Sequence, residues 1–410
     1  MKFLTGIRHP ALPRGILPAL VGLALSSLGS GAYAESVSED GGAYPTTPVI
    51  GSSVQIYGIV DSGLRHVDQS SSAGNLTQFT SGLNTSRVGL RGNEAIDADF
   101  RAGFRLESGF STGTGGQSNT ALFDRTAAAS LGWRSWDLKL GRQEGFGYED
   151  AATGATDPLH MALNFPNYSS PAAAGSKAPV LGANPLQAIY TYTYGQLRYD
   201  NALRLETHGQ SWAGGLLYAV GGVAGSWTDD TARGARISGA LGPVSGEALF
   251  QQSVDGSGNK STLGVLAGTW QVAAWTLQAG VHDLHIEAGF NSSGLGNGGS
   301  ASGIQGNSTT VSTALATAKE NFSNVVADLA ATWQATDRIP VTLAAYKTHV
   351  DGAGPGNSTA VVGLGKYCLS KRTALYLELD HAIESGTLAT KPVSTVADAT
   401  SYLIGINHRF

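Results

Sequence analysis

The chain has 410 residues, of which 56 are glycine, two are methionine and one is cysteine. Its 26 Lys and Arg against 31 Asp and Glu give a formal net charge of −5, which argues against nucleic acid as a partner. The single cysteine, Cys368, excludes an intramolecular disulfide framework. Beyond the first 34 residues, no segment reaches the 18 consecutive apolar residues typical of a membrane-spanning helix.

The amino terminus has the features of a secretory signal peptide. Lys2, Arg8 and Arg14 precede the apolar stretch Ile16–Leu25, and the small residues Ala32–Ala34 follow before the first acid. We expect this leader to be removed after its 34th residue, which leaves 23 basic against 31 acidic residues and a net charge near −8. The next 18 residues, up to position 52, form a Gly-, Pro- and Thr-rich lead-in to a barrel that spans 53–410.

From there the sequence alternates between apolar and polar residues, as in half-buried β-strands. Sixteen strands are predicted, at 53–64, 85–93, 99–110, 124–134, 137–143, 197–206, 214–223, 234–241, 245–254, 261–271, 274–284, 322–334, 339–350, 358–369, 372–384 and 399–410. Short connections alternate with long ones, the longest being 144–196. Short turns at one rim and long loops at the other are typical of an antiparallel transmembrane β-barrel rather than a soluble sandwich.

Charged residues indicate which face of this all-β barrel is wet. In the strand at 99–110, Phe100, Ala102, Phe104 and Leu106 alternate with Arg101, Gly103, Arg105 and Glu107. A charge at the lipid-facing midplane costs about 2–4 kcal/mol, so the charged face is predicted to line a water-filled lumen. The strand at 197–206 gives the same pattern, with Tyr199, Leu203 and Leu205 facing away from Arg198, Asp200, Arg204 and Glu206.

The chain ends in Phe410, preceded by a strand whose outer face carries Tyr402, Ile404, Ile406 and His408. We expect this strand to pair with the one that begins near Ser53, because an open sheet edge cannot exist within a bilayer.

Several constellations invite a catalytic or metal-binding interpretation. His282 and His285 are three apart, so on a strand their imidazoles point to opposite faces and no metal site is expected. The neighbouring Asp380 and His381 point apart for the same reason, which argues against an outer-membrane barrel enzyme. No phosphate-binding loop, Cys pair or nucleophile elbow occurs, and no cofactor is expected.

Several segments resemble the Gram-negative trimeric general porins of the β-proteobacterial type. The matching stretches are Val54–Gly63, Ser86–Glu94, Phe100–Phe110, Phe123–Arg125, Leu138–Gln143 and Leu369–Tyr376. The resemblance implies a sixteen-stranded homotrimer in the outer membrane of a Gram-negative bacterium, in contact with lipid and lipopolysaccharide. In this family the terminal Phe, here Phe410, resembles the signal that the barrel-assembly machinery reads.

The resemblance also implies that the third loop, 144–196, folds into the lumen and narrows it. In such porins a ladder of wall arginines faces acids on this loop; the matching wall positions are Arg87, Arg125 and Arg198. Strict alternation would send Arg125 outward, so its role requires a bulge or strand end before Ala129. Three further arginines face inward by parity, nearer the short turns: Arg91, Arg101 and Arg105.

The loop lacks the Pro-Glu-Phe-Gly segment of some relatives, and its candidate constriction acids are Glu149, Asp150 and Asp157. With arginines opposite these few acids, we expect passive diffusion of small hydrophilic solutes and ions with a mild anion preference. A substrate-selective channel of the same fold remains the main alternative. An adhesin is disfavoured because nothing beyond the loops offers a binding domain.

Overall fold

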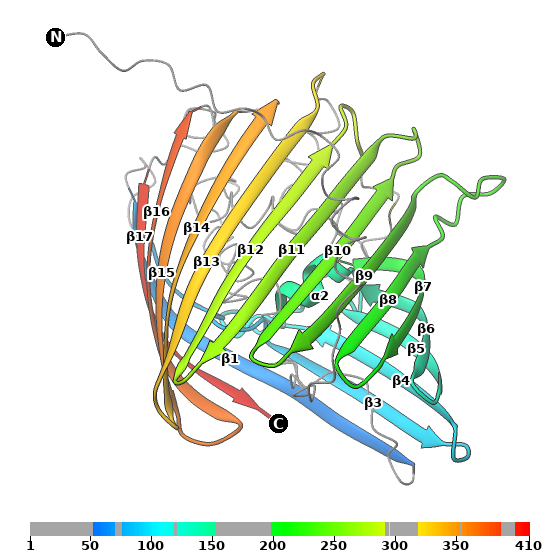
Figure 1. The fold of residues 1–410 in the computed structure, drawn as a ribbon, viewed down its shortest axis with the longest axis horizontal. Coiled ribbons are helices and arrows are strands. Elements are labelled where there is room, and N and C mark those ends of the chain that lie inside the picture. Colours follow the sequence, from blue (N-terminus) through cyan, green and yellow to red (C-terminus); the bar gives the residue numbers. More distant parts are fainter. Residues whose placement is uncertain are drawn as a thin grey trace.

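The computed structural model describes residues 52–69, 76–118, 121–152, 198–291, 295, 319–352, 355–386 and 398–410. The predicted leader and lead-in lie outside these residues, apart from Ser52. Figure 1 shows tilted strands that wrap around a lumen, with a short helix inside. No helix in the described ranges is long and apolar enough to cross a membrane.

The described elements are almost all strands. In chain order they are β1 Ser53–Gln69, β2 Leu76–Thr80, β3 Arg87–Ala95, β4 Phe100–Gly109, β5 Thr126–Trp133, β6 Trp136–Glu144, α2 Phe146–Ala152, β7 Arg198–His208, β8 Trp212–Ala219, β9 Thr231–Leu241, β10 Val244–Val254, β11 Lys260–Val272, β12 Trp275–Ile286, β13 Phe322–Thr336, β14 Ile339–Gly352, β15 Gly356–Cys368, β16 Thr373–Gly386 and β17 Asp398–Arg409. Each of the sixteen predicted strands overlaps one of these.

From β3 to β17 each strand pairs antiparallel with the next, in one sheet. Both β2 and β3 pair with the same edge of β1, at Gly63–Val67 and Ser53–Ile59 respectively, so they form one interrupted barrel strand. Among the described residues, the seventeen strand segments therefore make the sixteen strands predicted from the sequence. The segment β2 is an addition, because it lies in what was predicted to be a loop.

The last strand closes the barrel. β17 pairs antiparallel with β1 from Ile59 opposite Arg409 to Gln69 opposite Ala399. The terminal Phe410 continues this ladder, since its amide donates to the Gly58 carbonyl at 3.1 Å and its carbonyl accepts from the Gly58 amide at 3.2 Å. The predicted pairing of first and last strands is confirmed, and it removes a free sheet edge from the bilayer.

The two faces of the wall differ as the alternation predicts. On β16, Leu375, Leu377 and Leu379 are 43%, 51% and 47% exposed on the outer surface. Their neighbours Glu378 and Asp380 point inward and are buried. Since lipid cannot solvate a carboxylate, this strand is stable in a membrane only with its acids turned inward.

Six of the seven tryptophans mark the rim that carries the short turns. They stand next to these turns, are 38–48% exposed and lie on the outer face: Trp133, Trp136, Trp212, Trp270, Trp275 and Trp333. Phe100 stacks on Trp133 at 6.4 Å and Trp275 on Trp333 at 6.0 Å between ring centroids. Such a belt of amphipathic rings is typical of the boundary between hydrocarbon and water.

A buried carboxylate holds the interruption between β2 and β3. Asp61 on β1 accepts hydrogen bonds from the three backbone amides of 82–84, at 2.7–3.2 Å. It also accepts from the Tyr376 hydroxyl and the Asn407 amide, both at 2.7 Å. We call Asp61, 82–84, Tyr376 and Asn407 the closing seam, because they tie the first strand to the last two.

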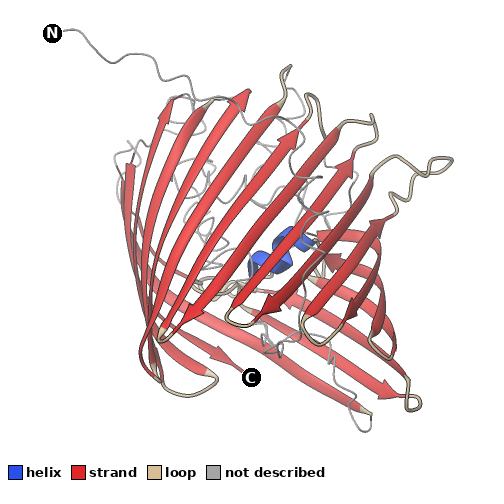
Figure 2. Cartoon of the chain, viewed as in Figure 1, coloured by secondary structure: helices blue, strands red, loops and turns tan. Residues whose placement is uncertain are grey.

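The helix α2 lies inside the ring of strands, as Figure 2 shows in blue. It follows β6 directly, so the described start of the third loop turns into the lumen as predicted. Its first residue belongs to an apolar cluster on the inner wall: Phe146, Tyr199, Ala202, Leu217, Ala219, Ala232, Leu249, Leu263, Val265, Leu284, Ile286, Phe290, Leu295, Phe322 and Val350.

Candidate pore constriction

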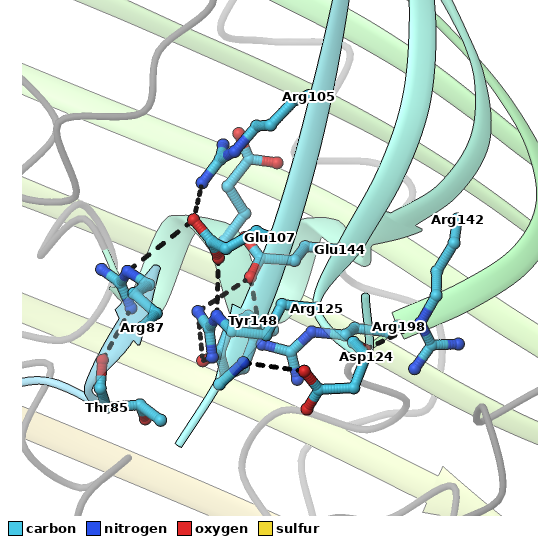
Figure 3. Close-up of polar contacts among 12 residues, drawn as sticks. Thr85, Arg87, Arg105, Glu107, Asp124, Arg125, Arg142, Glu144, Tyr148 and Arg198 are labelled. Atoms are coloured by element: carbon cyan, nitrogen blue, oxygen red, sulfur yellow. Dashed lines mark hydrogen bonds and ion pairs between the residues drawn. The ribbon is translucent and has the colours of Figure 1, made fainter. Parts of the chain in front are cut away.

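Four arginines and two glutamates meet on the inner wall beside α2; five of them come from four strands, and Arg125 directly precedes β5 (Figure 3). We call them the arginine cluster: Arg87, Arg105, Glu107, Arg125, Glu144 and Arg198. Arg87 begins β3, Arg105 and Glu107 lie on β4, Glu144 ends β6, and Arg198 begins β7. The side chains are no more than 12% exposed, and their formal charges sum to +2.

Glu107 is the centre of this cluster. Its carboxylate pairs with Arg125 at 2.6 Å, with Arg105 at 2.8 Å and, more distantly, with Arg87 at 3.9 Å. The Tyr57 hydroxyl also donates to it, at 2.9 Å. A carboxylate with no solvent contact is stable here because several cationic donors surround it.

Glu144 connects Arg125 to Arg198, the remaining arginine of the cluster. Its Oε1 accepts from Arg125 at 3.2 Å and from Arg198 at 3.1 Å. The guanidinium carbon of Arg198 lies 4.5 Å from the ring centroid of Tyr148 on α2. The Tyr148 hydroxyl accepts a hydrogen bond from Arg125 at 3.4 Å. The helix is therefore in direct contact with the arginine cluster.

The structure brings the three predicted wall arginines, Arg87, Arg125 and Arg198, into one cluster. Arg125 is 3% exposed and points inward because β5 begins only at Thr126, so the alternation of that strand does not include it. This is the strand end that the sequence interpretation required. Their role in solute selection remains a proposal.

The three other predicted inward arginines also face the interior but have separate environments. Arg105 belongs to the arginine cluster. Arg91 donates to Gln55 at 3.0 Å and lies over the Tyr57 ring at 5.2 Å. Arg101 pairs with Asp137 at 2.7 Å, next to a short turn.

Of the predicted loop acids, the structure describes the side chain of Glu149 alone. It pairs with Arg204 and, at 3.9 Å, with Arg236, rather than with the three predicted wall arginines. Burial raises the pKa of Glu149, but the guanidiniums of Arg204 and Arg236 lower it by more, so its pKa lies below the usual range. The side chain of Asp150 and all of Asp157 lie outside the described residues.

A second cluster surrounds Glu149. Glu206 accepts from Arg204 at 2.6 Å, from Arg236 at 2.5 Å and from Lys139. We call Lys139, Glu149, Arg204, Glu206 and Arg236 the helix-facing cluster; its formal charge is +1. Both clusters on this side of the lumen thus carry a positive excess.

Sequence reasoning missed two of these partners. Glu144 was assigned to the loop, although it ends β6 and pairs in register with Arg198. Glu107 was placed on the inward face without a role. A two-residue spacing from Arg105 would have identified it, because residues i and i+2 share a face.

One predicted orientation is wrong. Tyr199 was expected on the outer face, but it is fully buried inside, with its hydroxyl 2.8 Å from the Ser253 hydroxyl. The β6–β7 ladder is irregular between Gly141 and Gln143, and Asn201 has a positive φ of 51°. This bulge shifts the alternation, so Tyr199 and Ala202 both point inward.

The histidine pair separates as expected on a strand. His282 points inward and lies 3.1 Å from Asp328, whereas His285 is on the other face. Within the described ranges, no group of three or more His, Cys, Asp or Glu side chains is arranged to hold a metal ion.

A closed sixteen-stranded barrel with an apolar exterior, an aromatic belt and a charged interior defines an outer-membrane β-barrel of the porin class. The Gram-negative porin family model matches residues 19–307, and the chain belongs to this family. It is an outer-membrane protein of a Gram-negative bacterium.

Two curated relatives are outer-membrane porins. Outer membrane porin protein 32 of Delftia acidovorans is 31% identical over 151 residues, 35% of this chain and 41% of the relative. A porin of Bordetella pertussis is 29% identical over 185 residues, 41% of this chain and 42% of the relative. The chain thus spans about two fifths of the length of these relatives.

A solved structure extends the likeness over most of the chain. The anion-selective porin from Comamonas acidovorans has a TM-score of 0.59 at 19% identity, over 88% of this chain and 100% of that structure. At this identity the match supports the shared fold.

Proposed function

We propose that the protein is a passive diffusion channel for small hydrophilic solutes, with a mild preference for anions. The observation that carries this proposal is the arginine cluster, in which four guanidiniums outnumber two carboxylates at the point where α2 enters the lumen. Rings of charged side chains select ions by sign in channels. In this arrangement Arg87, Arg125 and Arg198 act as the basic wall, and Glu149 as one acid of the loop.

The test is the reversal potential of the purified mature protein in a planar bilayer under a salt gradient. We expect a current that reverses on the anion side. Firm cation preference would contradict the charge proposal, and the absence of channels would contradict the pore. A conductance drop caused by one solute at low concentration would instead indicate a substrate-selective channel.

We also propose four features of the exported and assembled protein. It is a homotrimer, as conductance steps in threes would show. The leader is removed after Ala34, which the mass of the exported chain would reveal. The terminal Phe410 serves as the signal for the barrel-assembly machinery, which the export of a Phe410→Ala variant tests. Lipopolysaccharide surrounds the outer rim.

A further inference from the structure

Phe146, the first residue of α2, fits a depression in the inner wall. It is fully buried and lies over Gly215 on β8 and Gly234 on β9. A Cβ at Gly215 would lie 3.0 Å from Phe146 Cζ, and one at Gly234 would lie 3.1 Å from Cδ2. We call Gly215 and Gly234 the glycine socket, because the ring occupies space that other side chains would fill.

Two arginines of the helix-facing cluster hold the same ring. The guanidinium carbons of Arg204 and Arg236 lie 4.5 Å and 4.9 Å from the Phe146 centroid. Both guanidiniums also contact Glu149, three residues further along α2. A cation over an aromatic face is attracted by the negative potential of the ring, and this attraction is stronger away from water.

Backbone contacts support the same attachment. The amide of Gly147 donates to Gln251 on β10 at 3.4 Å, and Arg204 donates to the Glu144 carbonyl at 3.3 Å. The start of the third loop is therefore fixed to β7, β9 and β10, and Phe146 is the residue at the centre of these contacts.

We propose that Phe146 is a positioning residue that fixes α2, the described start of the third loop, to the wall and thereby sets the conductance and ion preference of the pore. This inference rests on the proposed channel function. With the ring in the glycine socket, Arg204 and Arg236 are directed onto Phe146 and Glu149. Without it, α2 and the carboxylate of Glu149 move away from the wall, and Arg204 and Arg236 keep Glu206 as a carboxylate partner but lose Glu149, which leaves more positive charge at the wall.

Four variants test this arrangement by single-channel conductance and reversal potential. Phe146→Ala removes the ring, whereas Gly215→Ala adds a methyl group 3.0 Å from Cζ, so that the ring must shift by a few tenths of an ångström. We expect Phe146→Ala to raise the conductance and the anion-to-cation permeability ratio, each by about twofold, because the lumen widens and gains exposed positive charge. Gly215→Ala should shift both in the same direction by less. Phe146→Leu fills the socket without a π face, so a near-normal conductance with a partial shift in ion preference is expected.

Gly214→Ala is the matched control. Gly214 faces outward on the same strand, and the nearest atoms to its Cβ position are 3.6 Å away, an ordinary contact. It should behave as the wild type in both measurements. Heat-modifiable gel mobility shows that each variant is folded; if Phe146→Ala fails to assemble, Gly215→Ala and Phe146→Leu supply the comparison.

Folded variants with wild-type conductance and reversal potential would overturn the positioning role and leave Phe146 as a core residue only. This outcome is distinct from failure of the proposed function, which appears in the wild type itself. A wild-type channel with cation preference would contradict the charge proposal while leaving the conductance comparison among the variants intact.

Discussion

The arginine cluster and the closing seam are both buried charge networks on the inner wall, but their charges are balanced in different ways. In the cluster, the carboxylates of Glu107 and Glu144 are outnumbered by four guanidiniums. In the seam, the Asp61 carboxylate accepts hydrogen bonds from five neutral donors. Next to it, Arg65 pairs with both Glu378, at 2.9 Å, and Asp380, at 3.2 Å.

From this difference in charge balance we infer that the buried carboxylates serve a structural role in the seam and a role in ion preference in the cluster. Neutral donors satisfy Asp61 without adding an opposite charge, so its hydrogen bonds join strands and give the seam a structural role. The cluster keeps a positive excess beside the loop that enters the lumen. Changes in the cluster should therefore alter ion preference, whereas changes in the seam should alter barrel stability alone.

The largest effect is expected at Arg125, which joins the two glutamates of the cluster. Removing one partner of a buried ion pair costs about 3–5 kcal/mol, and the remaining arginines place Arg125→Gln at the low end of this range. The formal excess falls from +2 to +1, so the anion-to-cation permeability ratio should fall about twofold. Urea unfolding and reversal potentials measure the two effects. An unchanged reversal potential in the folded variant would contradict a selective role for the cluster.

The next largest effect is expected at the seam. Asp61→Ala leaves buried donors without an acceptor, which costs about 1–3 kcal/mol. Urea unfolding should shift while the reversal potential stays at its wild-type value. Asp68→Ala is the matched control, because Asp68 lies on the same strand, is about half exposed and contacts His66. A change in ion preference in Asp61→Ala would show that the seam and the cluster are not separate.

The fold was largely predictable because the alternation of apolar and charged residues depends on one energy difference, the free-energy cost of a charge that faces lipid instead of water. A leucine facing lipid and a glutamate facing the lumen, as at Leu377 and Glu378, leave one acceptable orientation for the strand. The prediction failed where the backbone departs from regular pairing. The bulge at Asn201 turns the side chain of Tyr199 inward instead of outward. The interruption held by Asp61 leaves the separate segment β2 within what was predicted to be a loop.

The site was predictable in part for a related reason. Arg87 and Arg198 follow from parity and from family resemblance, but which acids face them depends on register and on the path of the third loop. Glu144 lies beside Arg198 only because β6 and β7 pair with a particular register. Phe146 carries no sequence signal of its own, since the glycines and arginines that it contacts lie on strands far along the chain.

A smaller effect is expected at Glu149, through its ionisation. Its folded pKa lies below the unfolded value of about 4.3, so the ionised carboxylate stabilises α2 at all pH values above that value. This contribution disappears as the pH falls through the folded pKa. The anion-to-cation permeability ratio should therefore be constant from pH 8 to about 5 and rise in stronger acid, where Glu149 is protonated.

Glu149→Gln reproduces the acid state at neutral pH. Its permeability ratio at pH 7 should exceed that of the wild type, because the helix-facing cluster changes from +1 to +2. If the variant retains the same acid-induced step as the wild type, another carboxyl group is responsible for it.

The smallest effect is expected at an ion pair outside both networks. Arg134 and Asp99 lie 3.3 Å apart at a short turn, and their side chains are 64% and 47% exposed. An exposed pair contributes about 0–1 kcal/mol and is weakened further by salt. Asp99→Asn should leave both urea unfolding and reversal potential near the wild type. A shift as large as that of Arg125→Gln would mean that ion preference reports the total charge of the barrel, and the contrast between cluster and seam would lose its basis.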